Sequence, residues 1–506
     1  MNNFVPKRFF GRTGYQIFVD RFCRYDEKIP FIGGRILKCW SDQVPNWKPD
    51  DDGIYRNLYF YGGNLKGITS KLDYLKSLGI TLLYLSPISS TVSSHHYDVE
   101  DQTKIDTWIG DWNDFKELCQ KAHSKNILIC VDLVFNHFGA NSNFFKNAVK
   151  DSDSEYHGWF EWSESGEPIF WFGFKDLPEA NKSNAQFKKY VNYVCKTYLK
   201  NGADGIRLDL GECLPEKFLQ DLRKNLKENS SDSLIVSEMW ELANKKEHPQ
   251  IYGDQVDSVM NYPLSDAILK WIRYGNEAHF NYVLQEINKY PFEVQNVLWN
   301  FLDSHDTPRA INMLVGNGMI ESPFEGRIWD IEKNWKTSKE FDTYSFRKWE
   351  ADQDHSFNMG IAIKRLKLAS LIQYFQVGIP VLFYGTEASL TGYKDPFNRK
   401  PYPWDNPDYN LINFYRTLGK LRHKNLDIFC DKPIIEQAIT NKTLLQVRGS
   451  EKSTLVLVVN RTEEIQANPV RNWVLDGFEP IFRIGKFSDN NSLESYGAIV
   501  YRKDYI

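Results

Sequence analysis

Three acidic residues stand where short, largely apolar runs of the chain come to an end. Asp209, Glu238 and Asp306 each close such a run or follow it within three residues. A set of carboxyl groups of this kind could cleave a glycosidic bond, because one carboxylate can act as nucleophile or base while a carboxylic acid protonates the leaving oxygen. A single acid at a strand end is equally well explained as a solvated loop residue or half of an ion pair, but three together favour catalysis.

Basic side chains accompany these acids: Arg207 and His305 lie next to them in the sequence, and His137 follows the end of another predicted strand, Ile127–Phe135. Arg207 precedes Asp209 by two residues, and side chains two apart on a strand point to the same face. The fixed charge of Arg207 would keep Asp209 ionised and hold its orientation. These neighbours strengthen the catalytic interpretation of the three acids.

The acids can meet only if their strands belong to one sheet, and the periodicity of the chain predicts such a sheet. Eight β-rich runs alternate with helical stretches: Tyr15–Val19, Thr81–Ser86, Ile127–Phe135, Gly205–Leu210, Ser233–Trp240, Ser258–Tyr262, Val297–Asp303 and Pro380–Gly385. Some, such as Val381–Tyr384, are apolar throughout, which is typical of strands buried on both faces. Eight strands joined by crossover helices predict an α/β fold, a (β/α)₈ TIM barrel whose strand C-termini line one mouth.

The clearest helical pattern runs from Leu65 to Leu78, where Ile68, Leu72 and Leu75 share one face. Gly79 is expected to end this helix just before the second strand. We expect helices of this type to connect the strands of the barrel.

Two regions break the alternation and divide the chain. Residues 138–184 are rich in aromatic and polar side chains without a helical period, so we expect a loop-rich inserted domain over the C-terminal face of the barrel. From residue 425 only β-rich segments follow, which predicts a C-terminal β-sandwich over 425–506. Its expected strands are Thr443–Val447, Ser453–Val459, Trp473–Leu475 and Ala498–Tyr501. The catalytic barrel then comprises 1–137 and 185–424, with a long connection at 312–356.

Composition limits the classes of partner. The 62 basic and 66 acidic residues nearly balance, which favours a neutral ligand over nucleic acid or an anionic membrane. Aromatic residues make up 15% of the chain, as suits a sugar ligand that needs flat apolar platforms, although a large aromatic core would give the same figure. The seven cysteines suggest neither a disulfide framework nor a metal site, and no apolar leader or membrane span is evident, so we expect a soluble cytoplasmic protein.

An ordered series of motifs resembles the α-amylase family, glycoside hydrolase family 13. Four segments look like its signature regions: Asp132–His137, Gly205–Asp209, Val236–Glu238 and Phe301–Asp306. Further segments fit the same family: Phe60–Leu65, Asp257–Pro263, Gly378–Pro380, Tyr384–Glu387 and Asp395–Arg399. The resemblance covers roughly Tyr15 to Trp404 and is greatest to the neopullulanase and cyclomaltodextrinase branch.

The resemblance implies a role for each of the three acids. Asp209 would be the nucleophile and Glu238 the general acid/base. Asp306 would bind sugar hydroxyls and stabilise the distorted transition state. The implied reaction is a double displacement through a covalent glycosyl-enzyme.

The resemblance also implies substrate contacts around the acids. His137, Arg207 and His305 would contact the sugar at the cleavage point, and Tyr97 would stack beneath it with His95 as a further contact. Read without the resemblance, Tyr97 is an ordinary half-buried aromatic. Asp395 and Arg399 would hold the next sugar on the non-reducing side, and a surface salt bridge is the alternative for that pair.

Three departures from the family pattern limit what the resemblance implies. Cys213 stands where relatives carry His or Glu at the acceptor site, with Glu212 one residue earlier. The dimer-forming N-terminal domain of the branch is missing, which favours a monomer. The loop Cys23–Glu27 does not preserve the Asn- and Asp-rich calcium loop of relatives, whereas Asn136 and Glu179 align with another family calcium site. We therefore expect no required cofactor, and binding of Ca²⁺ stays an open alternative.

The sequence therefore predicts hydrolysis of α-1,4 bonds, with α-1,6 bonds as an extension, in maltooligosaccharides, cyclodextrins, pullulan or starch. A 4-α-glucanotransferase is the alternative, because a sugar hydroxyl can replace water at the same covalent intermediate. A non-catalytic glucan-binding relative is disfavoured because all three acids are present.

Overall fold

The computed structural model describes residues 4–25, 32–46, 48, 57–315, 358–393, 395–470, 477–485 and 491–505. Its centre is a barrel of eight parallel strands: β1 (Gly14–Ile17), β4 (Leu82–Leu85), β7 (Leu128–Val134), β8 (Gly205–Asp209), β9 (Leu234–Ser237), β10 (Ser258–Val259), β11 (Trp299–Asn300) and β12 (Ile379–Phe383). The strand order is β10-β9-β8-β7-β4-β1-β12-β11, and a parallel bridge between Met260 and Trp299 closes the ring. Each strand falls within or beside one of the eight predicted runs, which confirms the (β/α)₈ barrel.

Burial explains why these short segments form strands. All seven residues of β7 and all five of β8 are buried, as expected where helices cover the outside and side chains fill the inside. Gly205 opens β8 between Cys130 of β7 and Leu234 of β9. A Cβ there would lie 2.7 Å from Cys130 Sγ and 2.8 Å from the carbonyl oxygen of Leu234, so only glycine fits where the strand that ends in Asp209 begins.

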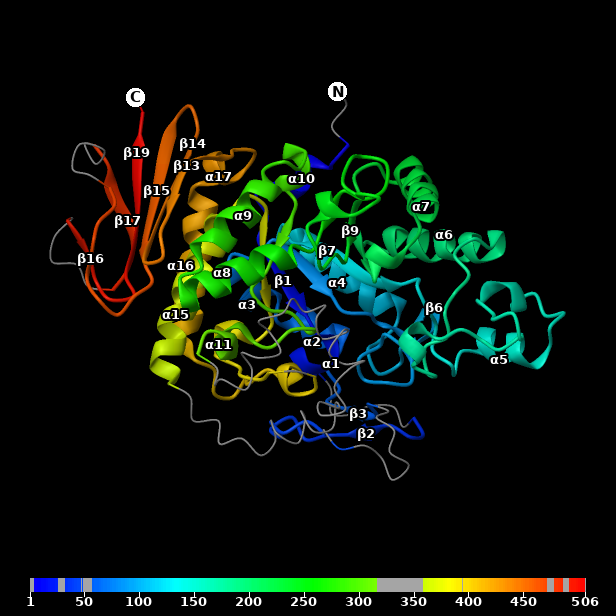
Figure 1. Ribbon diagram of the computed structural model, residues 1–506. Coiled ribbons are helices and arrows are strands. Elements are labelled where there is room, and N and C mark those ends of the chain that lie inside the picture. The colour runs from blue at the N-terminus through cyan, green and yellow to red at the C-terminus, as the bar shows by residue number, and fades with distance from the viewer. Residues whose placement is uncertain are drawn as a thin grey trace.

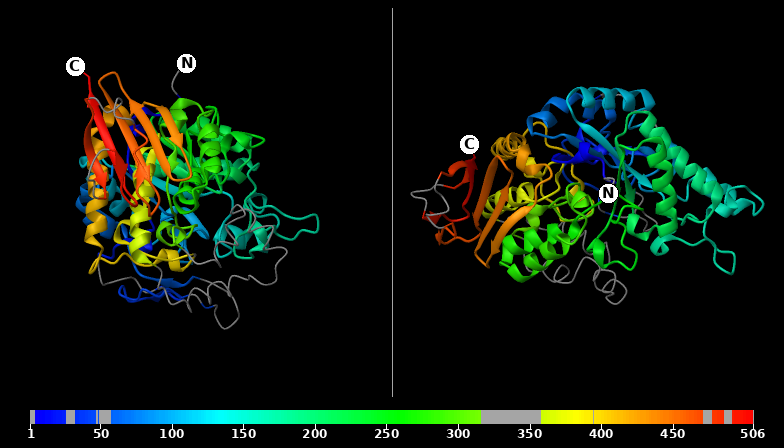
Figure 2. Two further views of the ribbon diagram at one scale, coloured as in Figure 1. Left: turned by 60° about the vertical axis from the view of Figure 1, so that its left-hand side comes forward. Right: turned by 90° about the horizontal axis from the view of Figure 1, so that it is seen from above.

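Helices surround the barrel (Figures 1 and 2). The longer ones are α2 (Leu65–Ser70), α3 (Leu72–Ser77), α4 (Trp112–Ser124), α6 (Ala185–Lys200), α7 (Glu216–Asn229), α8 (Tyr262–Tyr274), α9 (Glu277–Ile287), α15 (Met359–Phe375) and α16 (Tyr409–Lys424). Short ones are α1 (Val19–Phe22), α10 (Phe292–Gln295), α11 (Ala310–Met313) and α17 (Leu426–Phe429), with 3₁₀ turns η1 (Lys7–Phe9), η4 (Gly211–Cys213), η5 (Ala243–Lys245), η6 (Thr386–Ala388) and η7 (Phe397–Arg399).

The helix predicted over Leu65–Leu78 is in fact two helices. The backbone of Lys71 leaves the helical region with φ −103° and ψ 7°, which separates α2 from α3. The apolar face survives the break because Ile68, Leu72 and Leu75 are all buried. Gly79 follows with φ +80°, as a helix stop requires.

The segment between β7 and α6 carries its own small structure beside the barrel. It contains α5 (Asn143–Lys150), η2 (His157–Trp159) and η3 (Trp171–Gly173). The sequence indicated no helix here, and α5 corrects that expectation: Ser142 caps it, and Phe145 and Ala148 are its buried residues. A helix of two turns offers too few repeats for a period to be recognised.

Two further small sheets lie near the barrel: β2 (Ile36–Leu37) pairs with β3 (Tyr59–Phe60), and β5 (Ser89–Thr91) pairs with β6 (Val99–Ile105). No helix among the residues that the structure describes combines the length and apolar character needed to cross a bilayer.

The C-terminal part is an antiparallel β structure beside α15 and α16 (Figure 1). Its main sheet has the order β13 (Ile434–Ile439), β14 (Thr443–Gly449), β15 (Ser453–Asn460), β19 (Ala498–Asp504), β17 (Glu479–Ile484). A second sheet pairs β16 (Gln466–Ala467) with β18 (Ser492–Leu493), and Leu493 packs with Val456 and Ile499 of the main sheet in one apolar cluster. Buried Arg448 joins the sheet to the barrel by donating to the carbonyl oxygen of Phe375 at 2.8 Å.

Three of the four strands predicted for this region are present, and Trp473–Leu475 lies outside the described residues, as does most of the predicted connection 312–356. The division of the chain at 137/138, 184/185 and 424/425 stays a prediction.

Candidate active site

The structure brings Asp209, Glu238 and Asp306 to the same end of the barrel. Asp209 is the last residue of β8 and Glu238 follows β9 directly, while Asp306 lies beyond β11. The side chain of Arg207 joins the first two, because its Nη1 lies 3.0 Å from Asp209 Oδ1 and its Nη2 lies 2.9 Å from Glu238 Oε2. The two carboxyl groups therefore face one another across a single guanidinium group.

Arg207 also binds a third carboxylate whose role the sequence did not reveal. Its Nη1 lies 2.9 Å from both oxygens of Asp132, which is fully buried on β7 and also accepts a hydrogen bond from the hydroxyl of Tyr84 at 2.6 Å. The signal that could have identified Asp132 is its position, an acid inside the otherwise apolar strand Leu128–Val134. Asp132 therefore shares Nη1 of Arg207 with Asp209 and helps to fix the guanidinium.

The three carboxyl groups of Asp132, Asp209 and Glu238 surround the single positive charge of Arg207, and this excess of negative charge opposes their ionisation. Burial, followed by the charge of Glu238, raises the pKa of Asp209 well above its ordinary value, while Arg207 opposes the effect. Burial also raises the pKa of Asp132. Three carboxyl groups around one guanidinium oppose one another's ionisation. Arg207 alone therefore does not keep Asp209 ionised, contrary to the expectation from its place in the sequence, because burial and Glu238 outweigh it.

Glu238 is held by donors on both of its oxygens. The backbone N–H of Leu210 donates to Oε2 at 2.7 Å, and the indole N–H of Trp240 donates to Oε1 at 3.1 Å. Leu210 reaches this position in a left-handed conformation, φ 47° and ψ 36°, which is unfavourable for a residue with a Cβ. Backbone strain of this kind persists where the surrounding structure requires it, as at functional sites.

Asp306 and His305 form a second connected group at the mouth. His305 Nε2 lies 3.2 Å from Asp306 Oδ2, and burial together with the charge of Glu238 raises the pKa of Asp306 to about 7. Burial lowers the pKa of His305 well below its ordinary value, so its ring is neutral. The amide of Gln16 donates to Nδ1 at 2.8 Å, which places the ring proton on Nε2, beside the hydroxyl of Tyr97 at 2.5 Å.

The ring of Tyr97 lies flat against the ring of His305. Their centroids are 5.2 Å apart with planes 3° from parallel, and the Tyr97 hydroxyl donates to Asp132 at 2.9 Å. His95 accepts the backbone N–H of Tyr97 at 3.0 Å. His137 Nε2 lies 3.2 Å from the carbonyl oxygen of Tyr97, and burial lowers the pKa of His137 to about 4. These histidines therefore face the site as neutral hydrogen-bonding rings.

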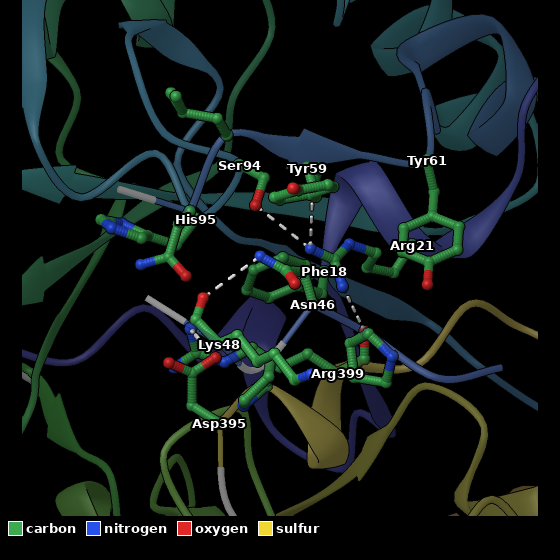
Figure 3. A pocket seen from close by; sticks show the side chains of 14 residues that line it. Phe18, Arg21, Asn46, Lys48, Tyr59, Tyr61, Ser94, His95, Asp395 and Arg399 are labelled. Atoms are coloured by element: carbon green, nitrogen blue, oxygen red, sulfur yellow. Dashed lines mark hydrogen bonds and ion pairs between the residues drawn. The ribbon is translucent and has the colours of Figure 1, made fainter. Parts of the chain in front are cut away.

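Asp395 and Arg399 lie at one side of the mouth and line a hollow open to solvent, which Figure 3 shows from close by. Arg399 Nη1 lies 3.2 Å from Asp395 Oδ1, and its Nη2 lies 3.6 Å from Asp306 Oδ1. Buried Arg21 fixes Arg399 from behind by donating to its carbonyl oxygen at 2.8 Å. Through Arg399 the hollow adjoins Asp306.

Sequence reasoning missed the far wall of this hollow. Asn46, Lys48 and Tyr59 line it from the chain between β1 and α2, and Lys48 lies beside Asp395 (Figure 3). Their segment carries no motif, so only the fold could place them near the acids.

Glu212, the residue before Cys213, is held in an ion pair. The Glu212 side chain is 4% exposed and its Oε2 lies 2.8 Å from Lys246 Nζ, so its carboxylate is engaged in an ion pair. Cys213 itself is exposed at the end of η4.

The residues aligned with a family calcium site do not fit a calcium ion here. The ammonium group of Lys182 lies 3.4 Å from the carbonyl oxygen of Asn136 and 3.6 Å from Glu179 Oε2. Ca²⁺ takes six to eight oxygen ligands, whereas here a built-in cation already faces these two oxygens. Within the described part of the chain, no cluster of three His, Cys, Asp or Glu side chains is suited to a metal. Asp26 and Glu27, from the loop that corresponds to the other calcium site of the family, lie outside the described residues.

Comparison with known proteins extends the similarity along most of the chain. A sequence model of the α-amylase catalytic domain matches residues 16–323. A cyclomaltodextrinase from Thermoanaerobacter pseudethanolicus is 30% identical, over 91% of this chain and 74% of its own length. Neopullulanase 2 from Thermoactinomyces vulgaris is 31% identical, over 81% and 62%. An amylopullulanase from Thermoanaerobacter thermohydrosulfuricus is 32% identical, but the chain spans only 30% of its length.

Solved structures share the architecture. The type III pullulan hydrolase from Thermococcus kodakarensis superposes with a TM-score of 0.77 and 26% identity, over 99% of this chain and 84% of that one. A cyclic α-maltosyl-(1→6)-maltose hydrolase from Arthrobacter globiformis superposes with a TM-score of 0.76 over 99% and 100%, at 23% identity. At this identity, the likeness to the Arthrobacter globiformis enzyme shows a shared fold alone.

Proposed function

Since the chain belongs to the α-amylase family of glycoside hydrolases, we propose that it cleaves α-glucosidic bonds with retention of anomeric configuration. The observation that carries the proposal is the pair of carboxyl groups of Asp209 and Glu238, held by the two terminal nitrogens of Arg207 at the mouth of the barrel. A retaining enzyme needs one ionised and one protonated carboxyl group side by side. We propose that the proton shared among these coupled carboxyl groups lies on Glu238 when the sugar is bound, which leaves Asp209 ionised for attack.

The reaction follows from these positions. Asp209 attacks the anomeric carbon and forms a covalent ester while Glu238 transfers its proton to the departing glycosidic oxygen. Glu238 then removes a proton from a water molecule whose oxygen attacks the same carbon and releases Asp209. Arg207 keeps Asp209 oriented through both steps.

The remaining residues would position the sugar. Asp306 would accept hydrogen bonds from its hydroxyl groups, and Tyr97 would pack against its apolar face. His95, His137 and His305 would complete the contacts as neutral rings. Asp395 and Arg399 would hold the next sugar within the hollow that they line.

The substrate class follows from the relatives. Enzymes named for cyclomaltodextrin and pullulan match most of this chain, which supports α-1,4 and α-1,6 linked glucans as substrates. All seven cysteines are free thiols, as a reducing compartment keeps them. We therefore also propose that the protein acts in the cytoplasm. We further propose that it is a monomer, which sedimentation analysis would test.

Product analysis tests the proposal. The protein is incubated with maltoheptaose, β-cyclodextrin and pullulan, and the first products are followed by proton NMR. We expect shorter sugars with the α-configuration; β-configured products or no cleavage would refute the proposal. Incubation with maltotriose separates hydrolysis, which yields glucose and maltose, from transfer, which yields longer chains. Asp209→Asn serves as the control and should be inactive.

A further inference from the structure

The inserted segment exposes a group of aromatic rings on the turn η3. Phe172 is 56% exposed and Phe174 is 39% exposed, while Trp171 between them and the barrel is partly buried. The ring centroids of Trp171 and Phe172 are 4.8 Å apart, and those of Trp171 and Phe174 are 5.9 Å apart. The three rings form one continuous apolar surface.

Phe172 is unfavourably placed in two independent respects. Its backbone is left-handed, φ 47° and ψ 21°, a region that residues with a Cβ avoid. Its ring is also exposed to water, where burial would have been favourable. Glycine at this position would remove both penalties. The ring therefore has to be explained by something that it binds.

The turn is fixed by its backbone. The N–H of Trp171 donates to the carbonyl oxygen of Leu177 at 3.0 Å, and the N–H of Gly173 donates to that of Phe170 at 3.0 Å. The N–H of Leu177 returns to the carbonyl oxygen of Phe174 at 2.9 Å. The exposed rings are thus presented by a rigid support, as a binding surface requires.

The aromatic surface is continuous with the candidate active site. The ring of Trp171 stacks on that of His137, with centroids 5.7 Å apart and planes 23° from parallel. His137 in turn contacts Tyr97, whose ring lies against His305 beside Asp306. Figure 1 shows the segment around α5, which carries this turn, projecting beside the barrel.

We propose that Trp171, Phe172 and Phe174 bind glucose units of the α-glucan that lie outside the catalytic pocket, and so give the enzyme a preference for longer chains. The apolar faces of pyranose rings pack on aromatic rings, which present a flat surface at little entropic cost. This inference rests on the proposed function, because it extends the same substrate along the surface.

The test compares Phe172→Gly with the wild type. Glycine suits the left-handed backbone, so the variant should unfold at a temperature no lower than the wild type. We expect the ratio of kcat/KM on maltoheptaose to that on maltotriose to fall about 3- to 10-fold, as for the loss of one aromatic stack. Phe172→Tyr keeps the ring and should retain the ratio. Ile169→Ala removes another exposed apolar side chain of the same segment, 40% exposed, and should also retain it.

Three outcomes would overturn the inference. One is an unchanged ratio in Phe172→Gly, and another is an equal fall in Ile169→Ala. The third is a dimer that sedimentation detects in the wild type and not in Phe172→Gly, since the rings would then serve contact between two copies. Calorimetric binding of maltoheptaose and maltotriose to the same proteins, each also carrying Asp209→Asn, measures affinity without turnover. If the wild type proves inactive but Phe172→Gly still lowers the affinity for maltoheptaose, the proposed reaction is refuted. The inference about the aromatic surface would then still hold.

Discussion

Replacement of Arg207 by lysine keeps the positive charge at the mouth of the barrel but removes the planar guanidinium group and its two terminal nitrogens. The guanidinium contacts Asp209 through Nη1 and Glu238 through Nη2, at 3.0 Å and 2.9 Å. A single ammonium group cannot occupy both positions. At least one of the two carboxyl groups therefore loses its charged partner and moves.

The size of the effect follows from these contacts. A hydrogen bond to a charged group contributes about 1.5–3 kcal/mol, so the loss of one should lower the free energy of unfolding by about that amount. Displacement of a reacting group by about 1 Å costs on the order of 10²-fold in rate. We expect Arg207→Lys to lower kcat/KM on maltotriose by at least about 10²-fold, mainly through kcat, because the ground-state sugar contacts remain.

The assay is glucose release from maltotriose, with urea unfolding followed in parallel. Arg422→Lys is the matched control, since Arg422 is equally buried but donates to the carbonyl oxygens of Tyr374 and Gly378 at 2.7 Å and 2.5 Å, away from the acids. It should lose stability and keep kcat. The reasoning is refuted if Arg207→Lys retains wild-type kcat, or if Arg422→Lys loses as much.

Three further predictions concern stability, metal and strain. Because burial and Glu238 raise the pKa of Asp306 to about 7, the folded state retains a proton that the unfolded state releases near pH 4. The unfolding free energy should therefore fall as pH rises from about 4 to 7, and Asp306→Asn should make this fall smaller in urea titrations; an unchanged fall would contradict the assignment. Since Lys182 faces the oxygens of Asn136 and Glu179, chelators should change neither melting temperature nor activity, and a drop on chelation would contradict this. Leu210→Gly should relieve backbone strain and keep kcat because its N–H to Glu238 remains, whereas Leu210→Pro, which lacks that N–H, should lose activity.

The barrel could be predicted from sequence because its strands are fully buried. Runs such as Leu82–Leu85 and Ile379–Phe383 are apolar throughout, and such a run can be recognised in the sequence before any contact is known. The exposed edges of the C-terminal sheet gave no such pattern. In β13 Ile435 is 64% exposed and in β17 Ile481 is 40% exposed, so neither strand alternates cleanly between apolar and polar positions.

The residues of the candidate site could be named from sequence only as far as they lie in recognisable motifs. Asp132 lies in such a motif, yet its contact with Arg207 depends on the register of β7 against β8. The ammonium group of Lys182 lies beside Asn136, but the two residues are far apart in sequence and nothing in the sequence around Lys182 marks it. Arg21 supports Arg399 across 378 residues of chain. Long-range contacts of charged side chains leave no local period, so the fold is needed to find them.

The central claim is that Asp209 attacks the sugar while Glu238 acts as acid and base. α-Maltosyl fluoride carries a leaving group that needs no proton, so Glu238→Gln should form the covalent intermediate but hydrolyse it slowly. Mass spectrometry of that variant, followed by peptide mapping, should find a maltosyl ester on Asp209, and none in a variant that also carries Asp209→Asn. A maltosyl group on any other residue, or release of β-maltose without an adduct, would contradict the account.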